Sequence, residues 1–348
     1  MSKPILGIIG GGQLGSMLAI AANKLEIKTV IFCDDIDAPA QNFSNDFVQC
    51  EYNDKNKINE FLSKVDVVTY EFENIPYKTL NEINKIKPVL PKPSVNRIIQ
   101  HRLAEKDFIN NLNIRTTRYV SIEKKSEMDS VEDLLPGILK TTTLGYDGKG
   151  QHPINSLENL DSIDVDYSKG YILEKLVKLK KEISIIITRF DIQKYEIYEP
   201  IENEHEDQIL RNSKIPAEIS DKILEQSKLW ATTIAEELKY VGTLCVEFFI
   251  DRNDNLYVNE IAPRVHNSGH LTINAYNVSQ FENHVRAVCK LEQIPLKKIS
   301  NAMMTNIIGD QITNYRNKEH NENEFFFDYL KKEIKPKRKM GHLTTLLK

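Results

Sequence analysis

A glycine-rich turn near the N-terminus is the feature that most constrains the fold of this chain. Gly10-x-Gly12-x-x-Gly15 follows the apolar stretch ILGIIG and leads into the stretch LAIAANKL, which is typical of a helix. A strand, a glycine turn and a helix begin a βαβ unit, and the acidic pair Asp34-Asp35 closes the next apolar run about 20 residues on. The turn predicts a parallel sheet and leaves open whether it binds a nicotinamide or flavin nucleotide or another ligand.

The rest of the chain shows two patterns of secondary structure and a short C-terminal segment. Up to about residue 95, short apolar runs alternate with amphipathic ones, which is typical of an α/β domain with parallel strands, and Ser94 is the expected N-cap of the helix that follows. From about residue 115, strands and hairpins surround the helical stretch ISDKILEQSKLWATTIAEEL, which is α+β texture. Residues 296–348 are expected to form a small separate cap.

Charge, hydropathy and cysteine content exclude some functions. A net charge of −4 offers no basic excess for nucleic acid, and no apolar run reaches the length of about 18 residues that would suggest a membrane span. The four cysteines (Cys33, Cys50, Cys245 and Cys289) form no Cys-x-x-Cys pair, so their spacing suggests neither a zinc site nor a disulfide framework. We expect a cytoplasmic protein.

The stretch LKTTTLGYDGKGQ, residues 139–151, predicts a mobile phosphate-binding loop. Lys140 ends a strand, and three glycines then alternate with polar residues that include Lys149. Unhindered backbone amides and ammonium groups suit the oxygens of a polyphosphate. The loop lacks the Walker A pattern, and the alternative interpretation is a hairpin with a long glycine turn.

A later hairpin brings two carboxylates together. In CVEFFIDRNDNLYVNEIAPR, a two-residue turn at Asn253-Asp254 would place Glu247 directly opposite Glu260. Opposed carboxylates repel each other unless a cation lies between them, and Mg²⁺ prefers such oxygen ligands. We therefore predict a magnesium site here, against the alternative of two solvated acids on an exposed face.

Polar side chains are dense in the next stretch, RVHNSGH, residues 264–270. It places Arg264, His266, Asn267, Ser268 and His270 around one glycine. So many hydrogen-bonding groups in an irregular segment favour a small polar anionic ligand.

A glycine-rich lid, a preceding lysine and a late carboxylate pair with Asn259 beside it are the layout of an ATP-grasp enzyme. The chain resembles the 5-(carboxyamino)imidazole ribonucleotide synthases, ATP-dependent carboxylases of purine biosynthesis, over nearly its whole length. The resemblance rests on GGGQLG at 10–15, YEFENIP at 70–76, GYDGKGQ at 145–151, NEIAPRVHNSGH at 259–270 and KPKRKMGH at 335–342. It implies an α/β and α+β ATP-grasp fold: a Rossmann-like domain at 1–95, an ATP-grasp domain at 96–295 with its lid at 139–151, and a cap at 296–348.

The resemblance also implies roles for particular residues around ATP. Glu247 and Glu260 would hold Mg²⁺, with Mn²⁺ as a possible substitute. The matching ATP-site residues are Arg102, Lys140, Gly145, Tyr146, Asp147, Gly148, Lys149, Gly150, Gln151, Glu174, Lys175, Leu176, Val177, Glu182, His205, Asn259 and Glu260. For His205, a surface loop histidine is the alternative.

The second substrates would be bicarbonate and 5-aminoimidazole ribonucleotide, which the glycine turn would face. Asp147, Arg264 and His266 are the expected catalytic residues. The residues matched to substrate binding are Gln13, Leu14, Glu73, Tyr146, Arg264, His266, Asn267, Ser268, Lys331 and Arg338. Lys335 and Lys337 replace an arginine and a glycine of the usual RPGRKMGH, so Lys337 is expected to demand a different turn.

Three alternatives to the carboxylase remain open at the level of the sequence. They are a formate-dependent glycinamide ribonucleotide transformylase of the same superfamily, an NAD-linked oxidoreductase that uses Gly10 to Gly15, and a catalytically silent binding protein. The resemblance also implies a homodimer.

Overall fold

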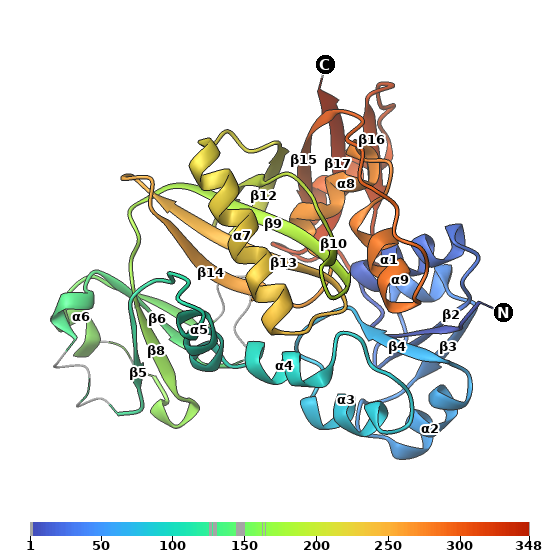
Figure 1. Cartoon of the computed structure of the whole chain (residues 1–348), viewed down its shortest axis with the longest axis horizontal. Coiled ribbons are helices and arrows are strands. Elements are labelled where there is room, and N and C mark those ends of the chain that lie inside the picture. Colours follow the sequence, from blue (N-terminus) through green and yellow to red (C-terminus); the bar gives the residue numbers. More distant parts are fainter. Residues whose placement is uncertain are drawn as a thin grey trace.

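The computed structural model describes residues 3–347 apart from 125, 126, 128–130, 144–149, 162 and 164. Three sheets organise this part of the chain, and Figure 1 shows the N-terminal sheet, in blue, and the small sheet of β5, β6 and β8, in green, on either side of the central strands. Among the described helices, none has both the length and the hydrophobicity needed to cross a membrane.

The N-terminal sheet is parallel, as the glycine turn predicts. Its strand order is β3-β2-β1-β4. The strands are β1 (Leu6–Ile9), β2 (Thr29–Cys33), β3 (Asp46–Gln49) and β4 (Val67–Tyr70). The helices are α1 (Gln13–Lys24), α2 (Lys55–Ser63), α3 (Tyr77–Asn84) and α4 (Pro93–Ile99). Strand β3 is an edge strand, and its end residues Asp46 and Gln49 are exposed.

The start of α4 differs from the expectation. The helix begins at Pro93 with Lys92 as its N-cap, so Ser94, the expected N-cap, lies inside the first turn. Proline suits the first helical position because it has no amide hydrogen that would need a partner there.

The second sheet is small and antiparallel, with the order β5-β8-β6-β7. Its strands are β5 (Tyr119–Ile122), β6 (Gly137–Thr141), β7 (Gln151–Ile154) and β8 (Tyr171–Lys175). The helices α5 (Arg102–Asn111) and α6 (Leu157–Asp161) accompany it. The predicted lid joins β6 to β7, and its residues 144–149 lie outside the described part of the chain.

The third sheet has the order β14-β13-β9-β11-β12-β15-β17-β16, with β10 beside β9. Its earlier strands are β9 (Leu179–Asp191), β10 (Lys194–Ile197), β11 (Ile201–Glu206), β12 (Ile209–Ile215), β13 (Gly242–Asp251) and β14 (Leu256–Ala262). The C-terminal strands are β15 (Asn301–Ile308), β16 (Glu324–Asp328) and β17 (Lys339–Leu347). Because β15 pairs with β12, the C-terminal segment extends the central sheet and has no sheet of its own among the described residues.

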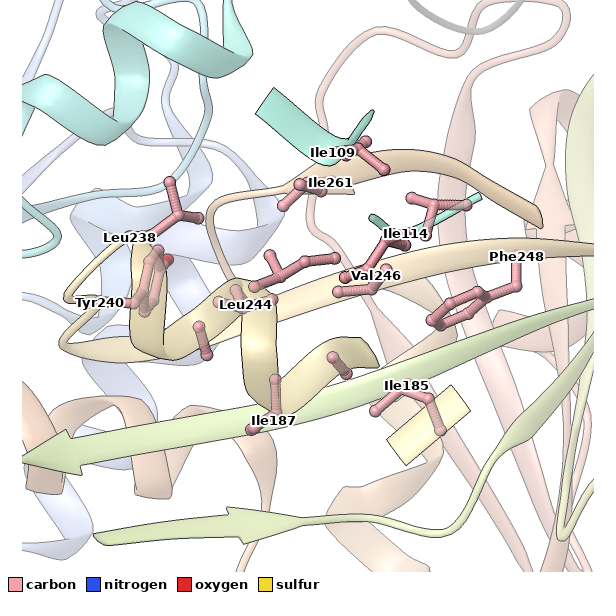
Figure 2. Packing of buried hydrophobic residues seen from close by; sticks show 14 of the residues in the cluster. Ile109, Ile114, Ile185, Ile187, Leu238, Tyr240, Leu244, Val246, Phe248 and Ile261 are labelled. Atoms are coloured by element: carbon pink, nitrogen blue, oxygen red, sulfur yellow. The ribbon is translucent and has the colours of Figure 1, made fainter. Parts of the chain in front are cut away.

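The largest core packs helix α7 (Asp221–Glu237) against strands β9, β13 and β14. Figure 2 shows Val246 and Phe248 of β13 near Ile185 and Ile187 of β9. Because side chains alternate along a strand, this face leaves Cys245 and Glu247 on the opposite side of β13. The buried face therefore determines which side chains can reach a site.

Helix α9 (Gln280–Val288) ties the N-terminal sheet to the central sheet. His284 Nδ1 accepts a hydrogen bond from the Thr243 amide at 3.0 Å, and its Nε2 lies 2.8 Å from Thr69 Oγ1. Burial lowers the pKa of His284 to about 3, so the ring is neutral. The remaining short helices are α8 (Thr272–Ala275) and α10 (Ile312–Arg316).

Candidate active site

A cleft of about 1070 Å³ lies where the three sheets meet. Its walls include most of the residues that the sequence singles out. These are Gln13, Leu14, Glu73, Arg102, Lys140, Gln151, Glu174, Lys175, Leu176, Val177, Glu182, His205, Glu247, Asn259, Glu260, Arg264, His266, Asn267, Lys331 and Arg338. The fold therefore gathers side chains from 13 to 338 around one space.

The structure does not describe every expected site residue on the cleft wall. Gly145, Tyr146, Asp147, Gly148 and Lys149 fall outside the described residues. Gly150 is described, with a φ of 71°, but it does not line the cleft.

Glu247 and Glu260 are direct partners across the β13–β14 hairpin, as expected. The expected two-residue turn is wrong, because Asp251 and Asn255 close a three-residue turn that holds Asp254 at a φ of 59°. A register shift between Glu247 and Phe248 then restores the pairing of the two glutamates. The pair was thus predicted correctly from a turn that is one residue too short.

The two carboxylates have different surroundings. Glu247 Oε1 lies 2.8 Å from His266 Nε2, whereas Glu260 Oε2 lies 3.5 Å from an Arg102 nitrogen. Burial alone would raise the pKa of Glu247, but the charge and hydrogen bond of His266 outweigh it and lower the pKa to about 2. Two opposed carboxylates on a cleft wall supply the oxygen ligands that suit Mg²⁺.

A buried network of ion pairs and hydrogen bonds lies behind the part of the cleft wall that carries Lys140. The Lys140 ammonium lies 3.1 Å from the Glu174 carboxylate, and the same carboxylate lies 3.2 Å from Lys106 and 2.8 Å from Thr117 Oγ1. Burial raises the pKa of Glu174, but the two lysines lower it well below its ordinary value. Glu174 is therefore an anion that helps to position Lys140.

Glu182 and His205 form a second pair on the wall, with His205 Nδ1 2.9 Å from Glu182 Oε2. Burial lowers the pKa of His205, but the hydrogen bond and charge of Glu182 raise it above its ordinary value. His205 is thus a member of the cleft rather than an isolated surface histidine.

The glycine turn already holds an anion from within the chain. The carboxylate of Glu71 accepts hydrogen bonds from the amides of Gly12, at 2.5 Å, and Gly15, at 2.6 Å. A Cβ on Gly10 would lie 2.4 Å from the Glu71 side chain, so this approach requires glycine. The amides of Gly12 and Gly15 are therefore used within the chain, whereas Gly12, Gln13 and Leu14 still line the cleft, and the expectation that the turn faces the ribonucleotide stays a prediction.

Arg264 and Glu73, both expected to contact substrate, pair with each other. Arg264 Nε donates to Glu73 Oε2, and its Nη2 donates to Oε1 at 3.2 Å. Burial would raise the pKa of Glu73, but Arg264 lowers it. The pair joins the segment after β4 to the segment after β14 across the cleft.

Ser268 is corrected from a direct contact to a positioning residue. Its side chain is fully buried and does not line the cleft, and its hydroxyl lies 2.8 Å from His266 Nδ1 and 2.8 Å from Ser184 Oγ. It therefore orients the His266 ring.

The C-terminal segment supplies cations to the same cleft. Lys331 Nζ donates to Gln13 Oε1 at 2.6 Å, and Arg338 donates to the Glu333 carbonyl at 2.9 Å. Lys337 has a φ of 63°, so it keeps the left-handed backbone that glycine favours, and the expected change of turn is wrong.

Sequence reasoning missed Glu71, Glu105 and Lys106. Glu71 follows β4, whose carboxyl end lies beside that of β1 in the parallel sheet, and this adjacency was the available signal. Glu105 accepts the Ile261 amide at 2.6 Å, and burial with the charge of Glu260 raises the pKa of Glu105 to about 8. Nothing in the local pattern around Lys106 marks it, since a lysine in a polar helix usually faces water.

The fold and site define an ATP-grasp enzyme, an ATP-dependent ligase. A family model of the ATP-grasp domain matches residues 107–281, and a ribonucleotide synthetase preATP-grasp domain matches residues 2–100. The phosphoribosylaminoimidazole carboxylase C-terminal domain matches residues 302–348. More particularly, the chain belongs to the N5-carboxyaminoimidazole ribonucleotide synthase family.

Relatives and solved structures support this membership over nearly the whole chain. The N5-carboxyaminoimidazole ribonucleotide synthases of Staphylococcus aureus strain MRSA252 and Brucella melitensis are each 37% identical, over 98% of this chain and 92% and 96% of theirs. The S. aureus enzyme complexed with ADP matches with a TM-score of 0.92 and 36% identity, over 99% of this chain and 93% of that one. The Aspergillus clavatus enzyme in complex with ADP and 5-aminoimidazole ribonucleotide gives 0.90 and 27%, over 99% and 94%.

Proposed function

We propose that this enzyme binds ATP and uses it with bicarbonate to carboxylate 5-aminoimidazole ribonucleotide, forming N5-carboxyaminoimidazole ribonucleotide, ADP and phosphate. One observation carries the proposal: side chains from the N-terminal turn, both antiparallel sheets and the C-terminal segment line a single cleft. Its volume of about 1070 Å³ exceeds that of most single-ligand pockets and suits a nucleotide beside a ribonucleotide.

The ATP phosphates would lie between the two antiparallel sheets. Lys140 and Arg102 supply positive charge, and each is held by a carboxylate, Glu174 and Glu260 respectively. Glu247 and Glu260, with Asn259 beside them, would hold Mg²⁺, which when bound neutralises charge on the transferring phosphoryl group. Preorganised cations of this kind accelerate phosphoryl transfer by electrostatics and positioning.

The chemistry proceeds in two parts. A bicarbonate oxygen attacks the γ-phosphorus of ATP, ADP leaves, and carboxyphosphate forms. Carboxyphosphate then releases CO₂ and phosphate, and the amine of the ribonucleotide attacks the CO₂ carbon and loses a proton. Asp147 and His266 are the candidate proton acceptors, and the structure describes His266, held between Glu247 and Ser268.

The ribonucleotide would lie toward the N-terminal and C-terminal segments. Gln13, Leu14 and Glu73 form that wall, with Lys331 and Arg338 as cations for the 5-phosphate. Domain limits at 1–95, 96–295 and 296–348, a homodimer, a cytoplasmic location and the use of Mn²⁺ complete the proposal.

The test measures ADP release with Mg-ATP and bicarbonate, with and without 5-aminoimidazole ribonucleotide. We expect strong stimulation by this ribonucleotide alone. A parallel reaction contains formate and glycinamide ribonucleotide, and stimulation by that pair instead would move the function to formyl transfer. Silence in both reactions would overturn the proposal.

A further inference from the structure

A sulfur, an oxygen and a nitrogen ligand meet beside the carboxylate pair. One ligand atom each of Cys245, Glu247 and His266 lies within 4.8 Å of the others. Cys245 and Glu247 are two residues apart on β13 and so share a face, and His266 comes from the segment after β14. We propose that these three side chains form a Zn²⁺ site that competes with the use of Glu247 for Mg²⁺.

The donor set selects zinc over magnesium. Thiolate and imidazole are preferred ligands of Zn²⁺, whereas Mg²⁺ takes oxygen ligands. Tetrahedral zinc with bonds of about 2.0–2.3 Å separates its ligand atoms by about 3.3–3.8 Å. Rotamer changes of about 1 Å therefore convert the observed cluster into such a site, with the 2.8 Å contact between Glu247 and His266 opening slightly.

Zinc binding has to displace a proton. Burial raises the pKa of the Cys245 thiol well above its ordinary value, so the thiolate forms only with the metal, and it then balances the charge of Zn²⁺ together with the Glu247 carboxylate. On binding, the S–H bond breaks, a sulfur–zinc bond forms, and the proton passes to water.

The surroundings supply orientation and access. Ser268 contacts His266 Nδ1 through its hydroxyl, at 2.8 Å, and through its amide, which donates at 3.4 Å, and these contacts keep Nε2 directed at the cluster. Zinc on Nε2 would place the ring proton on Nδ1, which can donate it to the Ser268 hydroxyl. Glu247 and His266 line the cleft, and Cys245 lies fully buried beneath them. A metal can enter from the cleft, and a water molecule there can complete the tetrahedron.

The consequence for turnover rests on the proposed function. Zinc at this site withdraws Glu247 from the carboxylate pair and His266 from proton transfer. Zn²⁺ bound at this site would therefore inhibit ATP cleavage, and a chelator would restore it.

Binding is tested on the full-length, metal-free protein without any turnover. Zn²⁺ is titrated in competition with a chromophoric chelator, and Co²⁺ is added separately to detect thiolate-to-metal charge-transfer absorption. In the wild type we expect one zinc site, with charge-transfer absorption when Co²⁺ occupies it. In Cys245→Ser we expect the zinc affinity to fall by at least ~10-fold and the Co²⁺ charge-transfer band to be absent. Cys289→Ser, which changes another buried free cysteine, is the matched control and should behave as the wild type.

Two further measurements keep the test decisive. Cys245→Ala guards against a folding defect in the serine variant, with unfolding midpoints compared for all proteins. Equal zinc affinity in the wild type and both Cys245 variants would overturn the site. Inhibition of ADP release by Zn²⁺ in the wild type but not in Cys245→Ser would support the competition, whereas a failed turnover assay with intact zinc binding would count against the proposed function alone.

Discussion

The amide of Gly15 donates a 2.6 Å hydrogen bond to the carboxylate of Glu71, so the glycine turn that resembles a dinucleotide site is occupied by the chain itself. A second bond from Gly12 completes the cradle. Burial raises the pKa of Glu71, against the lowering effect of these amides. The turn thus serves to fix the start of α1 and the segment after β4 rather than to bind a pyrophosphate.

Glu71→Gln tests this internal anion. The amide group places an N–H₂ against one backbone N–H, so a buried donor loses its acceptor, and we expect unfolding to become easier by about 1–3 kcal/mol. Urea unfolding measures the loss. Glu51→Gln, an exposed position, is the control and should stay within about 0.5 kcal/mol of the wild type. Equal effects of the two changes would contradict a special role for Glu71.

Lys106→Met tests the buried charge network. Lys106 is 2% exposed and donates to Thr116 and Thr117 besides pairing with Glu174. Breaking a buried ion pair from one side costs about 3–5 kcal/mol, and we expect a loss of this order in urea unfolding. Lys222→Met changes an exposed lysine as a control. A loss below about 1 kcal/mol would show that the network contributes little.

Acid should weaken the fold through Glu174. The pKa of this carboxyl is lowered from the ordinary 4.5, so its stabilisation is present above pH 4.5 and disappears as the pH falls below that value. We expect the free energy of unfolding to fall more steeply between about pH 4.5 and pH 3 in the wild type than in Glu174→Gln, by up to about 1.4 kcal/mol per pH unit. The exposed Glu204→Gln should keep the wild-type slope. Parallel slopes for all three proteins would refute this assignment.

Glu260→Ala should stop ATP cleavage while leaving the fold intact. Its side chain is 42% exposed on the cleft wall, so truncation removes a metal ligand without opening the core. We expect ADP release to fall by at least ~100-fold with an unchanged unfolding midpoint. Glu225→Ala, on the exposed side of α7, is the control. Wild-type turnover in Glu260→Ala would refute the metal assignment.

Lys337→Gly should stabilise the protein. A non-glycine residue in the left-handed region, such as Lys337, destabilises the fold by about 1–2 kcal/mol. Replacing it by glycine removes this strain, but the greater freedom of glycine in the unfolded chain cancels about half of the gain in stability. We expect a net gain of up to about 1 kcal/mol in urea unfolding. Lys335→Gly, at a residue without positive φ, should instead lose about 0.5–1 kcal/mol. A loss in both variants would contradict strain at Lys337.

Much of the fold and several site residues were predictable because their signals are local. The parallel N-terminal sheet followed from the glycine turn and the alternation of apolar runs, and the opposition of Glu247 and Glu260 followed from hairpin geometry. Even there, the turn length was wrong, and the bulge that compensates for it leaves no clear mark in the sequence.

The sequence by itself determined the order of elements, the family and the residue types that face the cleft, because hydrophobic period, turn chemistry and motif spacing act over short stretches. Only the tertiary structure decided which charges neutralise one another. Three contacts join segments 56 to 191 residues apart in the sequence: Glu71 with the glycine turn, Glu73 with Arg264, and Lys106 with Glu174. Such pairs depend on how sheets and helices meet in three dimensions, which no local pattern specifies.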